Sequence, residues 1–225
     1  MLQELKDQVP PEVFTQEYRN PVGGDPAKQR DNLREAVRLM KEAGYELRGN
    51  QMMNAKTGKQ LDIEFLIDSA GMERTIMPFV QSLKKIGINA NIRTVDAAQY
   101  TNRLRSFDFD ITVKLWATSP NPGNEQADYW GSAAADRQGS NNLAGKKNPA
   151  VDTLVKKVIF AKDRDEQVAA ARALDRVLLA NDYVIPQFYR GELFIAYWNT
   201  IVRPTELPYY GIGFPEAWWS ASAAK

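Results

Sequence analysis

The chain has 225 residues, of which 44% are hydrophobic and 25% are charged, proportions that are ordinary for a globular protein. Its 29 Lys and Arg nearly balance 28 Asp and Glu, so the net charge of +1 gives no reason to expect nucleic acid or an anionic membrane surface as a partner. The absence of His and Cys excludes disulfides, Cys-based zinc sites, and Ser-His-Asp or Cys-His catalysis.

Residues 1–24 are predicted to form an irregular lead-in, because they are polar and are interrupted by Pro10, Pro11, Pro21, Gly23 and Gly24. They contain no basic region followed by an apolar stretch, as a targeting segment would. Either the protein is cytosolic or the chain lacks its natural start. No apolar run approaches the roughly 20 residues of a membrane span, so direct membrane insertion is not expected.

A helix is predicted to begin at Asp25-Pro26, since Asp is a favourable N-cap and Pro is favoured at the first helical position. Its apolar residues recur at helical spacing, and Gly44 is expected to end it. These apolar residues are Leu33, Ala36, Val37, Met40 and Ala43. A hairpin should follow, in which Gln51–Asn54 pairs with a strand that starts near Gln60, around the turn Lys56-Thr57-Gly58.

Three strands separated by helices are predicted over residues 61–115. Residues 61–67, 88–93 and 109–115 alternate between apolar and polar side chains, as half-buried strands do. A helix with its apolar stripe from Ile76 to Ile86 and a short helix near 97–106 lie between them. Pro78 is expected either in the first turn of the former helix or at a kink within it. This β-α-β-α-β order predicts right-handed crossovers and a mixed, largely parallel α/β sheet flanked by helices.

Residues 117–148 carry no long hydrophobic period and are rich in Ser, Asn, Gly, Ala and Pro. A segment of this length in a compact domain is usually functional or disordered. It follows the carboxyl end of a strand, where open α/β sheets bind their ligands. We therefore expect it to form the wall of a ligand site.

Two further helices and an aromatic tail complete the chain. Asn148-Pro149 predicts the start of one helix, and Asp163 with Glu166 forms a capping-box-like start to the next, which ends near Asn181. Beyond them, 184–189 and 193–198 resemble short strands. Between Tyr183 and Trp219 lie 11 of the 23 aromatic residues.

Several stretches, in order, resemble the dipeptide- and oligopeptide-binding class (family 5) of bacterial extracellular solute-binding proteins, which serve ABC importers. They are Ala36-x-x-Leu39-x-x-x-Ala43-Gly44-Tyr45, Leu83–Arg93, Phe107-Asp108-Phe109-Asp110 followed by Trp116, Asn148–Asp152, and Val184-Ile185-Pro186. Two others, Ser119–Gln126 and Gly211–Trp219, are most similar to the branch for uptake of peptides and of the peptide-nucleotide antibiotic microcin C. The resemblance covers most of the chain.

The resemblance implies a non-catalytic periplasmic protein that binds oligopeptides for an ABC permease in the inner membrane. Such proteins are longer than this chain and enclose the ligand between two lobes of the type II periplasmic-binding-protein fold. By this likeness, residues 25–183 form most of the second lobe, and 184–225 form a C-terminal segment that returns to a first lobe absent from the chain. No cofactor, catalytic residue or metal ligand is expected.

Eight candidate ligand contacts follow from the resemblance and from the position of the loop: Trp116, Thr118, Ser119, Asn124, Glu125, Tyr129, Asn141 and Asn142. Trp116 is a candidate for stacking against the peptide backbone or an apolar side chain of the ligand. In the alternating pattern of the strand it points away from the face of Ile111, Val113 and Leu115. The alternative is therefore a core Trp that packs beneath a helix on the other face. For the Asn residues the alternative is turn formation, and for Tyr129 a hydrophobic clasp on the loop.

In better-known peptide binders of this class, a carboxylate three residues after the strand-end Trp pairs with the amino group of the peptide. That position here is Ser119, and Glu125 is the candidate to supply the charge instead.

Two rival functions remain open. One is a carboxylate-based glycoside hydrolase that uses Asp or Glu pairs with Trp platforms, although the sequence supplies no recognisable pair. Asp108 and Asp110 resemble a carboxylate pair, but a turn cap at 108 and a solvent-facing strand residue at 110 are favoured. The aromatic tail suggests a protein-interaction domain, since monomers rarely expose so much contiguous apolar surface.

Overall fold

The computed structural model describes residues 1–116, 119–187, 192–209 and 211–221. The chain divides into two compact units, Met1–Ile185 and Pro186–Lys225. The first unit contains a parallel sheet and most of the helices, so the predicted mixed α/β class is confirmed.

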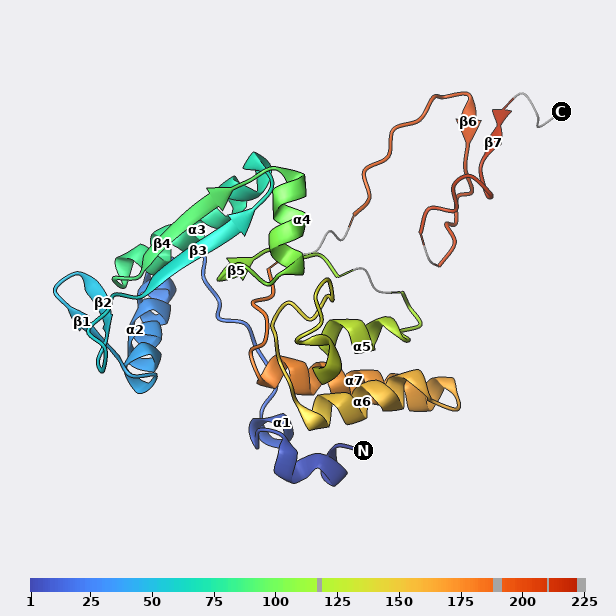
Figure 1. Cartoon of the computed structure of the whole chain (residues 1–225). Coiled ribbons are helices and arrows are strands. Elements are labelled where there is room, and N and C mark those ends of the chain that lie inside the picture. The colour runs from blue at the N-terminus through green and yellow to red at the C-terminus, as the bar shows by residue number, and fades with distance from the viewer. Residues whose placement is uncertain (117–118, 188–191, 210, 222–225) are drawn as a thin grey trace. The chain divides into compact units, whose positions relative to one another are not determined.

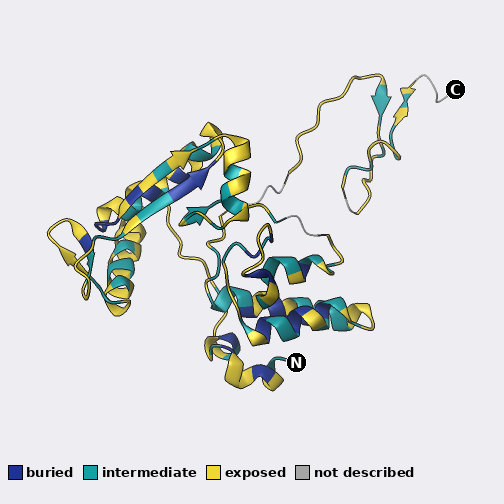
Figure 2. Ribbon diagram, in the orientation of Figure 1, coloured by how far each residue is buried: buried dark blue, intermediate teal, exposed yellow. Residues whose placement is uncertain are grey.

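The central sheet has the strand order β4-β3-β5 and is parallel throughout (Figure 1). β3 (Asp62–Ile67) pairs along its length with β4 (Asn89–Thr94), whereas β5 (Ile111–Thr112) pairs only with Phe65 and Leu66. β5 is therefore much shorter than the expected strand 109–115. Phe65, Leu66 and Ile67 are buried, and Figure 2 shows this part of β3 inside the fold.

The crossover helices are α3 (Ala70–Lys85) and α4 (Ala97–Arg105). The Ser69 hydroxyl accepts the N–H of Met72 at 3.4 Å and caps α3, so the helix begins well before Ile76. Of the two alternatives for Pro78, the position in the first turn is excluded, because Pro78 lies in the interior of α3. There it has no N–H to donate to the carbonyl of Arg74.

The predicted hairpin is confirmed, and its first strand has a second partner. After α2 (Pro26–Glu42), the positive φ of Gly44 leads the chain directly into β1 (Tyr45–Arg48), which pairs antiparallel with β2 (Gln51–Asn54). On its other side, β2 pairs with the chain near Gln60, as predicted, through an antiparallel bridge from Met53 and two flanking backbone hydrogen bonds of 2.8 Å. The Met52 side chain is buried in the core that contains residues of β3 and β4.

The prediction of an irregular lead-in over 1–24 is confirmed for 16–24 and is wrong for most of 1–15. A 3₁₀ helix (η1, Leu2–Gln8) and α1 (Glu12–Thr15) bury Leu5, Val9 and Val13 against two long helices. These are α6 (Pro149–Ile159) and α7 (Arg164–Ala180), which pack on each other (Figure 1). The ammonium group of Lys157 also pairs with Glu4 at 2.8 Å.

The predicted starts of α6 and α7 are confirmed. The Asn148 side chain accepts the N–H of Ala150 at 2.9 Å. Asp163 accepts the N–H of Glu166 at 2.8 Å, and the Glu166 carboxylate accepts the N–H of Lys162 at 2.9 Å, one residue before the usual capping-box donor. α6 ends at Ile159, and α7 ends at Ala180, close to the predicted end near Asn181.

The second unit holds a two-stranded antiparallel sheet of β6 (Ile201–Val202) and β7 (Trp219–Ser220). The predicted strands at 184–189 and 193–198 are wrong where the structure describes them, since 184–187 and 193–198 are irregular; 188–189 lie outside the described residues. Trp218 packs edge-on against Tyr197 and Phe214, with ring centroids 4.9 and 5.4 Å away. No helix within the described ranges is long and apolar enough to cross a membrane.

Candidate functional site

The segment that follows β5 contains more regular structure than its sequence predicts. Its described part, 119–148, includes α5 (Glu125–Trp130) and a short 3₁₀ helix, η2 (Ser132–Ala134). β5 is held at its carboxyl end by Tyr100, whose hydroxyl donates to the carbonyl of Val113 at 2.8 Å. The segment thus starts from an anchored strand end.

Trp116 is fixed by two contacts from this segment. Its ring stacks on Trp130, with centroids 5.4 Å apart and an interplanar angle of 30°. Its indole N–H donates to the carbonyl oxygen of Asn141 at 3.3 Å. The alternation used to orient Trp116 does not apply, because β5 ends at Thr112 and Leu115 is 87% exposed.

Asp128 of α5 organises the polar part of the site. One carboxylate oxygen, Oδ2, accepts both the backbone N–H of Asn141, at 3.3 Å, and its side-chain Nδ2, at 2.7 Å. The other oxygen, Oδ1, accepts from Arg137. Asp128 was not predicted as a site residue. The only indication in the sequence is its position directly before Tyr129 and Trp130, within a segment predicted to be a loop.

Asn142 has a different environment from its neighbour. Its side chain is buried, with 1% exposure, and its Nδ2 donates to the carbonyls of Gly131 at 3.0 Å and Lys146 at 2.9 Å. Its Oδ1 accepts the N–H of Lys146 at 3.3 Å. These contacts correspond to the turn-forming alternative and leave the amide engaged within the loop.

Ser119, Asn124 and Glu125 lie at the start of the segment. The Ser119 hydroxyl donates to the carbonyl of Asn121 at 2.6 Å, and Asn124 is the exposed N-cap residue of α5 without a side-chain cap. The Glu125 carboxylate accepts the N–H of Gly123 at 2.8 Å. Partial burial acts to raise the pKa of Glu125, but the backbone N–H groups of Gly123 and of Glu125 itself outweigh it and lower that pKa.

The start of the segment is also held by α7. Arg164 donates to the carbonyl of Pro120 at 3.1 Å and to the side chain of Asn121 at 2.8 Å, and Gln167 donates to the carbonyl of Pro122 at 3.0 Å. Prolines have no N–H, so this stretch is rich in acceptors, and α7 supplies the donors. Neither Arg164 nor Gln167 was predicted.

The remaining candidates are Thr118 and Tyr129. Thr118 lies outside the described residues. Tyr129 is half-buried on α5, beside Trp130. The structure therefore brings Trp116, Asn141 and α5 together at one place, with Ser119 and Asn124 at the adjoining start of the segment.

Asp108 and Asp110 do not form a carboxylate pair. Arg103 donates through Nε to Asp108 at 2.9 Å, and Asp110 accepts the backbone N–H of Glu64 at 2.9 Å. The expectation that Asp110 faces solvent is confirmed, since the residue is exposed, although it lies directly before β5 and not within a strand. Both carboxylates thus serve local structure. Among the described residues, no group of three or more acidic side chains is placed to hold a metal ion.

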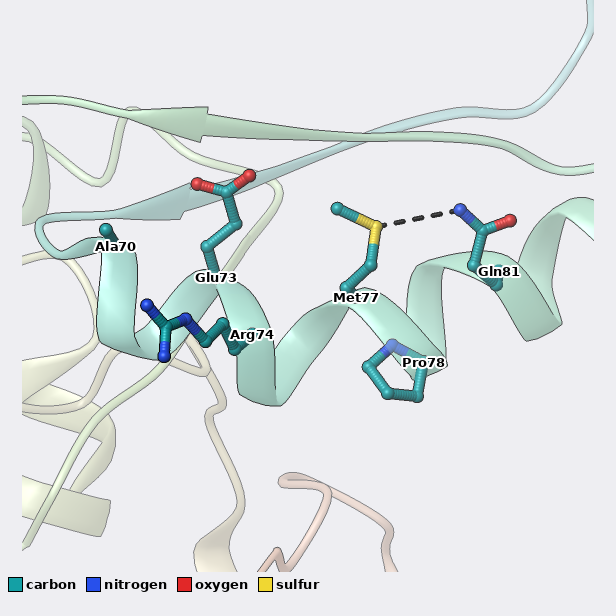
Figure 3. Close-up of a pocket in the computed structure, with 6 residues that line it drawn as sticks. All are labelled: Ala70, Glu73, Arg74, Met77, Pro78 and Gln81. Atoms are coloured by element: carbon teal, nitrogen blue, oxygen red, sulfur yellow. Dashed lines mark hydrogen bonds between the residues drawn. The ribbon is translucent and has the colours of Figure 1, made fainter.

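The hollows on the described surface lie elsewhere. A depression of about 630 Å³ runs along the outer side of α3, and Figure 3 shows that all of its lining side chains come from this one helix. They are Ala70, Glu73, Arg74, Met77, Pro78 and Gln81. A smaller hollow of about 370 Å³ lies over the N-terminal residues. The depression on α3 encloses no ligand because a single helix lines it, and the smaller hollow is lined by residues 3–15, far along the chain from the strand ends of the sheet.

Comparison with known proteins gives a family match and close relatives. The model of the bacterial extracellular solute-binding proteins, family 5 (middle region), matches residues 4–138. The "Probable peptide-binding protein YejA" of Agrobacterium fabrum is 84% identical over 225 residues, which are 100% of this chain and 37% of that protein. The "Peptidoglycan-binding protein YepA" of the same organism is 35% identical over 98% of this chain and 36% of its own length. The chain therefore spans about a third of these relatives.

Solved structures share the fold at low sequence identity. A periplasmic oligopeptide-binding protein from Thermotoga maritima, with bound mannohexaose, matches 87% of this chain and 41% of its own, with a TM-score of 0.64 and 19% identity. The oligopeptide-binding protein AppA from Bacillus subtilis, in complex with a nonapeptide, matches 67% of this chain and 30% of its own, with a TM-score of 0.59 and 20% identity. At this identity the likeness concerns the fold.

Proposed function

Because this chain belongs to the bacterial extracellular solute-binding proteins of family 5, we propose that the protein containing it binds peptides in the periplasm and delivers them to an ABC permease. The binding is non-catalytic. The name of the 84%-identical relative favours a peptide as ligand. Microcin C, which the sequence resemblance suggests, is the finer proposal for the same site.

One observation carries the site assignment. Trp116, just beyond the carboxyl end of β5, is stacked on Trp130 and bonded to Asn141. Ligands of open α/β sheets bind beyond the carboxyl ends of the strands, and aromatic rings with a few directed polar groups are typical of such sites. We propose that a peptide contacts Trp116, Ser119, Asn124, Tyr129 and Asn141, together with Thr118 and Glu125.

The division of the chain supports a two-lobed protein. We propose that residues 25–183 form most of one lobe, and that 184–225 pack on a lobe supplied by the part of the protein outside this chain. The second unit has aromatic side chains to bury: Phe194, Trp198 and Tyr209 are 84%, 83% and 91% exposed. Apolar exposure of this extent favours a partner surface.

The proposal is tested by calorimetric titration of the full-length protein with a panel of peptides. The panel contains peptides of two to five residues and microcin C. It also contains a peptidoglycan-derived peptide, because the 35%-identical relative is named as a peptidoglycan-binding protein. Saturable binding of at least one peptide is expected, with no hydrolysis of aryl glycosides. Glycoside turnover, or no binding across the panel, would contradict the proposal.

A further inference from the structure

We propose that Asp128 is a positioning residue, which sets the orientation of the Trp116 ring through Asn141. The inference rests on the proposed function, because it concerns the ligand-binding role of Trp116. It also makes a claim about the ring itself that can be measured without any ligand.

Three hydrogen bonds form a relay from α5 to Trp116. Asp128 Oδ2 accepts the backbone N–H and the side-chain Nδ2 of Asn141, at 3.3 and 2.7 Å. The carbonyl oxygen of Asn141 then accepts the indole N–H of Trp116, at 3.3 Å. Two bonds to one oxygen hold Asn141 by both its main chain and its side chain, so the direction of its carbonyl is determined by Asp128.

The same helix also supports the face of the ring. Trp130, two residues after Asp128 on α5, stacks on Trp116 and itself packs against the buried core of α6 and α7. Trp116 is therefore held at its edge by the relay from Asp128 and at its face by Trp130. With its edge released, stacking alone would leave the indole free to turn in its own plane and slide over Trp130.

The charge of Asp128 strengthens this relay. Its side chain is only 30% exposed, and hydrogen bonds to an ionised acceptor are shorter and stronger than neutral ones. Arg137 pairs with Oδ1, so the ion pair and the relay use different oxygens. An Asn at 128 would retain one acceptor oxygen and present an NH₂ group to either Arg137 or the Asn141 amide.

The test compares Asp128→Asn with a matched control, Asp136→Asn, in the full-length protein. Asp136 lies in the same segment and pairs with Lys147, but in the described part of the chain it forms no hydrogen bond with Asn141. The readout is the exciton signal of stacked indoles in circular dichroism, assigned by its loss in Trp116→Phe and in Trp130→Phe. Asp128→Asn should diminish this signal, and Asp136→Asn should preserve it.

A binding arm separates this inference from the proposed function. We expect Asp128→Asn to weaken binding of tri-alanine about tenfold, the effect of one charge-assisted hydrogen bond. Loss of the indole signal with unchanged tri-alanine affinity would uphold the positioning role and contradict the role of Trp116 in binding. An unchanged indole signal would overturn the inference, whatever the affinity.

A second variant covers the case in which Asp128→Asn fails to fold. Asn141→Ala removes only the 2.7 Å side-chain bond and keeps both backbone contacts of residue 141. A partial loss of the indole signal is expected. Retention of the full signal in a folded Asn141→Ala protein would count against the relay.

Discussion

The carboxylate of Asp110 accepts the backbone N–H of Glu64 at 2.9 Å, directly before the first paired residues of β5 and β3, Ile111 and Phe65. A side chain thus supplies the hydrogen bond that a longer strand would supply with its backbone. Since β5 has only two residues, this bond is a substantial part of what holds the strand that leads to Trp116.

Replacement of Asp110 by Ala should therefore lower the free energy of unfolding by about 1 kcal/mol, the usual net value of one hydrogen bond. Asp110→Asn keeps an acceptor oxygen and should lose less. Urea denaturation of the three proteins checks the order. Equal losses in Ala and Asn variants would show that the bond to Glu64 contributes nothing and that charge alone matters.

Gly87 is expected to be intolerant of any side chain. Its φ is +83°, and a Cβ there would lie 2.7 Å from the backbone nitrogen of Met52 and 3.0 Å from the carbonyl oxygen of Asn50. Gly87→Ala should therefore cost more than about 3 kcal/mol. Gly58 is the matched control, because its φ is +67° with nothing within 4 Å, so Gly58→Ala should cost only about 1–2 kcal/mol. Thermal melts that show similar losses would contradict the close approach.

Trp116→Ala in the full-length protein should weaken peptide binding by roughly 1–3 kcal/mol, as expected for an aromatic anchor. Leu115→Ala is the control, because Leu115 is adjacent and 87% exposed. Its affinity should stay close to wild type. Unchanged affinity in Trp116→Ala, measured by the same titration, would assign Trp116 to loop packing alone.

Stability should be nearly constant between about pH 6 and 8, because the chain has no His. At lower pH, the free energy of unfolding should depend on the ionisation of Glu125. Its pKa is lowered from the ordinary value of 4.5 by the backbone N–H groups of Gly123 and of Glu125 itself, despite the opposing effect of burial. Its stabilisation is thus present above pH 4.5 and is lost as the pH falls through the lower, folded-state pKa.

Glu125→Gln isolates the contribution of Glu125 to this pH dependence. Burial raises the pKa of Asp175, so Asp175 changes the stability with pH in the opposite direction. Because Asp175 is present in both proteins, its effect cancels in the comparison. The stability difference between wild type and Glu125→Gln should shrink as the pH falls below 4.5. Melting curves recorded between pH 3 and pH 8 check this, on either side of the ordinary carboxyl range. A difference independent of pH would show that the carboxylate charge is not involved.

This chain by itself should bind peptide only weakly, with a Kd near millimolar, about −4 kcal/mol. If the proposed two-lobed architecture holds, one lobe leaves part of the ligand in water while the full entropic cost of association remains. Calorimetry with a peptide that binds the full-length protein is the comparison. Micromolar affinity for the chain alone would show that the site is self-contained.

The sequence by itself determined the starts of α2, α6 and α7 and the alternation of strands and helices along the central part of the chain. An N-cap is made by hydrogen bonds over two or three residues, so Asp25, Asn148 and Asp163 reveal their helices without any distant contact. Strand alternation likewise reflects burial of one face, which located β3 and β4. Trp116 and Asn141 were proposed as ligand contacts from resemblance and loop position, and the structure joins them by a hydrogen bond.

Only the tertiary structure decided the partners. The sequence predicted that Gln51–Asn54 pairs with the chain near Gln60, and the structure adds β1 on the other side of this strand. The residues around Leu5 and Val13 were predicted to be irregular, because the surface that buries their side chains is supplied by the distant helices α6 and α7. Asp128 reaches Asn141 across 13 residues of loop, and no local propensity encodes such a contact. It exists because the packed position of α5 brings the carboxylate to the amide.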